Sequence, residues 1–125
     1  MDALRRVHEA LVPEGILLDL MPFEAAVPVE TVDGELGRLD AREFARDVVA
    51  TVGALMRTVR DGLYELERES TFDVLEHFES ADRLLEEVDG WRGTMVPRPL
   101  QARLECADPP FRVRQPLVLR RLRAR

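Results

Sequence analysis

The sequence contains no lysine and no asparagine, and a single cysteine, Cys106. Without lysine there is neither a Schiff-base amine nor the lysine of a phosphate-binding loop. One cysteine excludes a disulfide-stabilised scaffold. No apolar run approaches the roughly 20 residues of a membrane-spanning helix, and no signal peptide opens the chain, so we expect a cytoplasmic protein without membrane contact. All positive charge is carried by arginine, which we interpret as codon bias in a GC-rich bacterium.

The overall composition is that of a soluble globular protein. Of the 125 residues, 46% are hydrophobic and 34% are charged, which argues against disorder. The length suits one domain, covering 1–125, with one hydrophobic core.

Charge is distributed unevenly along the chain. The net charge is -6, but residues 1–97 hold ten arginines and 22 acids, whereas residues 98–125 hold eight arginines and two acids. The acidic part would repel phosphates, so we expect no nucleic-acid partner. The basic end favours self-association or docking onto the acidic part. The six arginines between Arg112 and Arg125 could grip a phosphate, but a solvated strand face explains them better.

The first 40 residues predict one helix and three strands. Apolar spacing predicts a helix over 2–12, which Pro13 ends. The near-continuous apolar run 16–21 predicts a central strand buried on both faces. After a loop over 23–28, Asp33-Gly34 predicts a hairpin of strands 29–32 and 35–39.

The remaining residues predict a long helix, two short helices and further strands. Asp40 is expected to cap a helix over 41–60 whose apolar stripe includes Val49. Alternation over 63–78 predicts two strands with a bend near Ser70-Thr71. We expect the later elements to be a helix begun by Ser80, a short helix through Leu100 and Leu104, and a strand over 111–119 that Pro116 pushes to a sheet edge.

These elements predict an α+β fold. We expect a small mixed or antiparallel sheet with the 41–60 helix and the shorter helices packed on it.

The block Ala3–Asp19, ALRRVHEALVPEGILLD, resembles class I S-adenosylmethionine-dependent methyltransferases. In that family a helix ending in an R-V-L-x-P-G-G-type turn leads into the fifth strand of the sheet. Here the turn is Leu11–Gly15, and Glu14 takes the place of one glycine. The order downstream is also similar, with an elaborated middle, a helix and a last strand near the C-terminus.

The resemblance covers only the C-terminal half of that fold. The family's cofactor-binding strand, glycine-rich loop and acid all lie upstream of the matching block. This chain has no G-x-G-x-x-G among its seven glycines, so no cofactor-binding residue carries over and we expect no bound cofactor. Met1 is either the natural start or the mis-assigned start of a longer reading frame. S-adenosylmethionine would bind only if another chain completed the fold.

A half-sheet would leave strand 16–21 with an open apolar edge. The hairpin and the C-terminal strand could cover this edge, or two copies could meet. We therefore expect a homodimer, or a complex with a separate protein partner.

Four residues are candidates for a ligand or interface site. Asp19 and Glu24 flank the end of strand 16–21, where open α/β sheets bind ligands, although a turn cap at Asp19 and a solvated loop acid at Glu24 explain them better. Trp91 and Arg92, between Gly90 and Gly93, could form a ligand platform or an interface anchor, although the indole could simply fill the core.

The sequence predicts neither a metal site nor identifiable catalytic residues. His8, His77 and Cys106 lack the spacing of metal ligands, and Cys106 is expected to be a small apolar helix residue. Glu65, Glu67 and Glu69 are expected to form a charged strand face that discourages edge pairing.

Three functions remain open at this point. The first is a methyltransferase-like protein without the cofactor half, inactive alone and acting as a dimeric binding or partner module. The second is a methyltransferase completed by another chain or truncated by its reading frame. The third is a small-ligand-binding homodimer that uses a groove near Asp19, Trp91 and Arg92.

Overall fold

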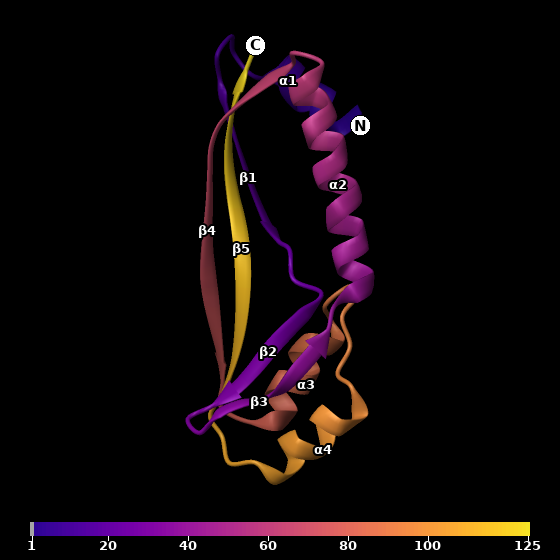
Figure 1. Cartoon of the computed structure of the whole chain (residues 1–125), viewed down its shortest axis with the longest axis vertical. Coiled ribbons are helices and arrows are strands. Elements are labelled where there is room, and N and C mark those ends of the chain that lie inside the picture. Colours follow the sequence, from indigo (N-terminus) through magenta and orange to yellow (C-terminus); the bar gives the residue numbers. More distant parts are fainter. Residues whose placement is uncertain (1) are drawn as a thin grey trace.

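In the computed structural model, which describes residues 2–125, five antiparallel strands form one sheet with four helices beside it (Figure 1). This confirms the expected α+β class. The elements in chain order are α1 (Asp2–Ala10), β1 (Ile16–Pro22), β2 (Ala26–Thr31), β3 (Gly34–Asp40), α2 (Arg42–Arg60), β4 (Tyr64–Phe78), α3 (Ala81–Asp89), α4 (Arg98–Cys106) and β5 (Phe111–Ala124).

The C-terminal strand β5 is the centre of the sheet, contrary to the edge position that Pro116 predicted. Strand β4 pairs with β5 along its whole length, from Phe111 to Ala124. The other side of β5 is shared by two strands placed end to end. Strand β1 pairs with 117–123 and β2 with 112–113, while β3 pairs only with β2.

Pro116 is tolerated in this central strand because it falls in the gap between β1 and β2. The N–H of Ala124 donates to Gly15 on the β1 side, and that of Arg125 donates to Leu63 on the β4 side. Backbone directions alternate along a strand, so the even-numbered residues of β5 point towards β1 and β2. The missing N–H of Pro116 therefore faces a stretch that neither strand pairs with.

Strand β1 is not the doubly covered central strand that its apolar run predicted. It pairs only with β5, and Leu18 and Leu20 are 63% and 53% exposed. The continuous apolar run arises because one face packs under the helices while the other stays open.

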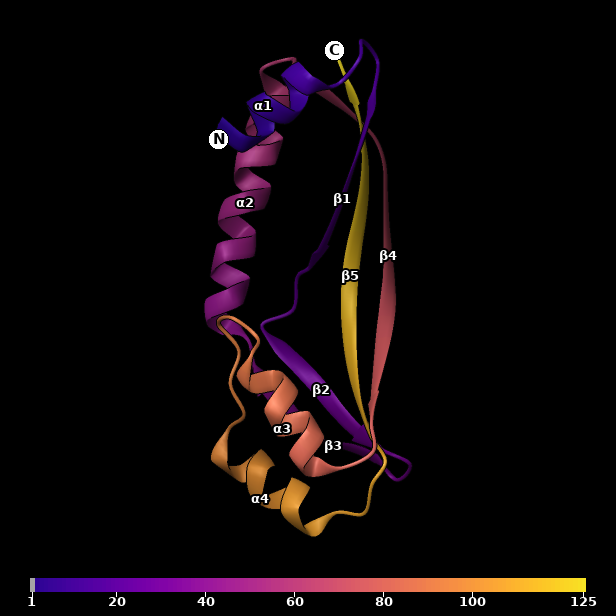
Figure 2. The ribbon, with the colours of Figure 1, turned by 180° about the vertical axis from the view of Figure 1, so that it is seen from behind.

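Within the described residues, two buried clusters take the place of the expected single core. The first, around Phe111 and Val113, packs under α3 and α4; the second, around Leu122 and Ala124, packs under α1 and the end of α2. Odd and even residues point to opposite faces of a strand. The right-handed twist of the long β4–β5 pair brings both faces in turn to the side that carries the helices (Figures 1 and 2).

The long helix is confirmed, but its cap residue and its buried stripe differ from the prediction. Helix α2 spans the predicted range, but its cap position is Ala41, and the Asp40 carboxylate accepts the N–H of Arg42 at 3.1 Å. Val49 lies outside the buried stripe, at 72% exposed. No helix within residues 2–125 has the length and apolar character needed to cross a lipid bilayer.

Two strand predictions need correction. Residues 64–78 form one strand with a bulge between Leu66 and Arg68, instead of two strands with a bend at Ser70. Strand β2 begins at Ala26 inside the expected loop, and the hairpin turns at Val32-Asp33, one residue earlier than predicted.

Candidate functional site

Asp19 lies on β1 and is engaged by a central arginine. Its carboxylate accepts a hydrogen bond at 3.2 Å from Arg120 on β5, and Arg120 also donates to Glu69 on β4 at 3.0 Å. The side chains of Arg120 and Asp19 are only 11% and 16% exposed. The two carboxylates, from the strands on either side of β5, neutralise the Arg120 guanidinium in a poorly solvated place.

Every arginine from Arg112 to Arg125 is paired with an acid of a neighbouring strand or terminus. We call this set the arginine ladder; its further pairs are Arg112 and Arg114 with Glu30, Arg114 with Asp73, Arg121 and Arg123 with Glu67, and Arg125 with Glu65. The basic end therefore docks onto the acidic part of the same chain, and its charges are satisfied without a phosphate.

Glu67 is the most strongly engaged acid of the ladder. The guanidinium of Arg123 donates to it at 2.7 Å, and Arg121 donates at 3.1 Å. The hydrogen bond from Arg123, with the nearby positive charges, lowers the pKa of the Glu67 carboxyl below its ordinary value of 4.5.

The other predicted site residues lie in two different places. Glu24 is exposed in the short connection between β1 and β2. Trp91 is partly buried against the cluster under α3, whereas the Arg92 side chain is 87% exposed and lies 3.9 Å from Asp47. The hollow that contains Trp91 is not lined by Asp19, Glu24 or Arg92.

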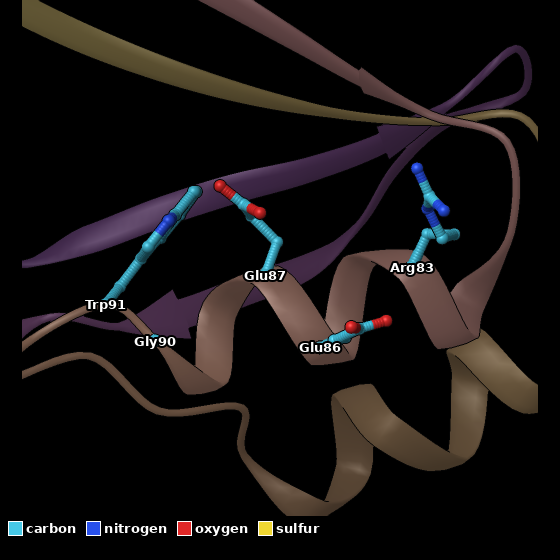
Figure 3. A pocket seen from close by; sticks show the side chains of 5 residues that line it. All are labelled: Arg83, Glu86, Glu87, Gly90 and Trp91. Atoms are coloured by element: carbon cyan, nitrogen blue, oxygen red, sulfur yellow. The ribbon is translucent and has the colours of Figure 1, made fainter.

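That hollow is open, with a volume of about 420 Å³, and is lined by Arg83, Glu86, Glu87, Gly90 and Trp91. Figure 3 shows the Trp91 indole and the Glu87 carboxylate on the same side of α3, with Glu86 pointing elsewhere. The arrangement places an indole and a carboxylate beside the same open hollow of α3.

A second hollow adjoins the first at the end of β4. It has a volume of about 410 Å³, and we call it the acidic hollow because three carboxylates and one arginine line it. The lining residues are Glu76, His77, Phe78, Glu79, Arg83 and Glu87. Partial burial, and then the negative charge of Glu87, raise the pKa of the Glu76 carboxyl. An additional positive charge here would be stabilised.

The histidines and the cysteine do not form a reactive group. His8 Nε2 is 2.8 Å from the Arg125 carbonyl, and its ring packs edge-on against Tyr64. Cys106 ends α4 and is exposed, so the expected apolar role is wrong. Within residues 2–125, no group of three or more His, Cys, Asp or Glu side chains could hold a metal ion.

Within residues 2–125, the face of the sheet turned away from the helices has no structural partner. Leu18, Leu20, Phe72 and Val74 are between 41% and 63% exposed there. The strand register places Leu117 opposite Phe72, and Leu119 opposite Leu20. We call these six side chains the open sheet face.

Beside this face, the outer edge of β4 pairs with no strand of residues 2–125. Every residue from Thr71 to His77 is exposed. An open edge presents unpaired N–H and C=O groups to solvent, and natural sheets usually protect such edges.

Alternation alone could not reveal this face. Phe72 and Val74 share the even parity of the buried Tyr64 and Phe78, so alternation alone places all four on one face of a strand. The bulge between Leu66 and Arg68 places Tyr64 on the opposite face of the sheet from Phe72 and Val74. Phe78 shares the face of Phe72 and Val74, but it lies where α3 and α4 cover that face.

Comparison with known proteins returned no match: no family model fits the sequence, and neither a curated protein nor a solved structure is similar enough to count as a relative.

Proposed function

We propose that this protein is a non-catalytic, methyltransferase-like binding module that works as a homodimer. The observation that carries the proposal is the open sheet face, which leaves four large apolar side chains exposed on two strands. Contiguous exposed apolar surface is typical of interaction sites. The open edge of β4 continues this surface.

A second copy is the occupant that the charges favour. The arginine ladder beside the open sheet face is neutralised by acids of the same chain. The surface thus carries no excess charge that would select an acidic or basic partner, and two identical surfaces can meet without repulsion.

The resemblance to methyltransferases has one supporting detail in the backbone. Glu14, which stands where the family has a glycine, has a φ of 65°. This is the left-handed region, which glycine adopts most easily. The turn from α1 into β1 therefore has the geometry for which the family's glycine is suited.

Two contacts in the block that resembles the methyltransferases argue against a nucleoside cofactor at this place. The N–H of Gly15 donates to the Val12 carbonyl, so this turn has no free donor at that position for a phosphate or carboxylate. The Asp19 carboxylate, which could have bound a ribose hydroxyl, is held by Arg120. Both contacts support a protein that transfers no methyl group by itself.

The proposal is tested by mass and by cofactor titration. Sedimentation velocity at micromolar concentration should give twice the chain mass of 14.3 kDa. Isothermal titration with S-adenosylmethionine should give no binding. A species of 14.3 kDa would refute the dimer, and micromolar affinity for the cofactor would refute the non-catalytic assignment.

The second candidate is a methyltransferase completed by another chain. It is favoured by β1, whose edge away from β5 pairs with no described strand and carries Leu18 and Leu20. A separate cofactor-binding chain could add a strand there. Reading the DNA upstream of Met1 distinguishes this candidate, since an in-frame strand followed by a glycine-rich loop would favour the enzyme.

A further inference from the structure

We propose that β4 pairs antiparallel with β4 of a second copy, with the twofold axis passing through Phe72. The inference rests on the proposed homodimer and places its contact at the open edge of β4; of the open sheet face, only Phe72 and Val74 lie on the strands that would pair. The two sheets would become one continuous sheet, and Arg68 of each copy would enter the acidic hollow of the other.

The direction of the backbone groups limits the possible registers. Arg125 donates to Leu63, so odd-numbered residues of β5 point towards β4. After the bulge, their partners on β4 are the even-numbered residues, such as Phe72 opposite Leu117. Residues 69, 71, 73, 75 and 77 therefore direct their N–H and C=O groups outwards. A symmetric pairing must match these odd-numbered residues with one another. The midpoint between two odd residue numbers is itself a residue number, so the twofold axis passes through a residue and not between two.

Three registers place the twofold axis near the middle of the exposed stretch, at Thr71, Phe72 or Asp73, and the charges that face each other favour one of them. An axis through Thr71 would place Glu69 opposite Asp73 of the second copy. An axis through Asp73 would place that carboxylate opposite itself. An axis through Phe72 places Arg68 opposite Glu76, and no acid faces an acid between them. Like charges directly opposite destabilise a strand pair, whereas opposite charges stabilise it.

The two charges matched in this register are the ones that remain unpaired in a single copy. Between residues 68 and 76 of β4, Glu69 is bound by Arg120 and Asp73 by Arg114. Arg68 and Glu76 form no ion pair within residues 2–125, and both are exposed. The pairing therefore neutralises, twice in each dimer, the two charges of the stretch 68–76 that form no ion pair within residues 2–125.

The acidic hollow provides a site for the guanidinium of Arg68 from the second copy. It holds Glu76, Glu79 and Glu87 against one arginine, Arg83. The raised pKa of Glu76 reflects a site that favours an added cation. At the axis itself, Phe72 would contact its own copy, and aromatic cross-strand pairs are among the stabilising ones.

Cross-linking tests the register. In a Cys106→Ser background, Ser70→Cys and Val74→Cys are made as separate proteins and mixed under mild oxidation. The register places Ser70 opposite Val74 of the second copy, in a pair without direct hydrogen bonds, whose Cα atoms lie about 4.5 Å apart. The mixture should form a disulfide dimer. Each variant alone should not, because its own cysteines lie about 13 Å apart along the strands.

A charge exchange tests the contact with the acidic hollow. Arg68→Glu should raise the dimer dissociation constant by about tenfold, because it replaces two attractive pairs by two repulsive ones. The double variant Arg68→Glu, Glu76→Arg should restore dimerisation. Arg46→Glu, at an exposed arginine of α2, is the matched control and should leave the dissociation constant unchanged.

Failure of this inference differs from failure of the proposed function. A dimeric mass without the mixed disulfide, and without an effect of Arg68→Glu, would show that the copies meet elsewhere and would overturn the β4 pairing alone. A monomeric mass for the unmodified chain would overturn both.

Discussion

Gly93 and Phe44 meet backbone to backbone, where the loop after α3 reaches the first turn of α2. The Gly93 carbonyl accepts the N–H of Phe44 at 3.2 Å, which satisfies one of the free donors at this helix start. A Cβ atom on Gly93 would lie 2.6 Å from that nitrogen, and φ at Gly93 is 69°. The conspicuous Gly90–Gly93 segment thus ties α3 to α2.

Gly93→Ala should destabilise the protein strongly. The left-handed backbone and the clash with Phe44 together should lower the free energy of unfolding by about 3 kcal/mol. Urea unfolding followed by circular dichroism measures this. Gly53→Ala is the matched control, since a Cβ there meets only the end of Arg57 at 3.6 Å. Removing a glycine from a helix interior should stabilise by about 0.5–1 kcal/mol. Equal effects of the two variants would contradict the contact described.

The turn between α1 and β1 should respond in opposite directions at two adjacent positions. Glu14→Gly relieves the left-handed strain and should raise the free energy of unfolding by about 1 kcal/mol. Gly15→Ala should lower it, because the new Cβ would lie 2.9 Å from the Val12 carbonyl oxygen. Thermal unfolding of both variants is sufficient, and stabilisation by Gly15→Ala would show that the turn is built differently.

The pair of Asp19 and Arg120 should make a clear contribution to stability. Asp19→Ala leaves a poorly solvated guanidinium with Glu69 as its remaining partner, so it should cost about 2 kcal/mol of unfolding free energy. Glu24→Ala removes an exposed acid from the neighbouring connection and should change stability by less than about 0.5 kcal/mol. Chemical denaturation compares the two. If both substitutions were neutral, Asp19 would be free for the ligand role that its position first suggested.

Glu67 should make the stability of the protein depend on pH in the acid range. Its carboxyl has a pKa below 4.5 in the folded protein, so its contribution is present above that pH and is lost as the pH falls through the lowered pKa. Glu67→Gln removes this contribution. The difference in melting temperature between the native chain and the variant should therefore be largest near neutral pH and shrink under acid conditions. Glu24→Gln, at an acid without an ion pair in the structure, should show no such trend. A constant difference for Glu67→Gln would exclude an electrostatic origin.

Local features were predictable because they depend on neighbours in the chain. Helix α2 follows from its apolar period and the acid before it. Asp33-Gly34 predicted the hairpin of β2 and β3, although its turn residues are Val32-Asp33. The site was less predictable. Asp19 was identified as an acid at a strand end, but its partner Arg120 lies more than 100 residues away and could not be inferred from spacing.

The amino-acid sequence by itself determined the α+β class, the long helix, the alternating strands and the excess of arginine at one end. Only the tertiary structure decided that β5 is central, that β4 keeps an open edge, and that Phe72 and Val74 face solvent while Tyr64 and Phe78 are buried. The physical reason is that strand order and burial depend on pairing across the chain, on the bulge in β4 that exchanges its two faces, and on the twist that turns each face towards or away from the helices. A pattern with a period of two cannot encode either.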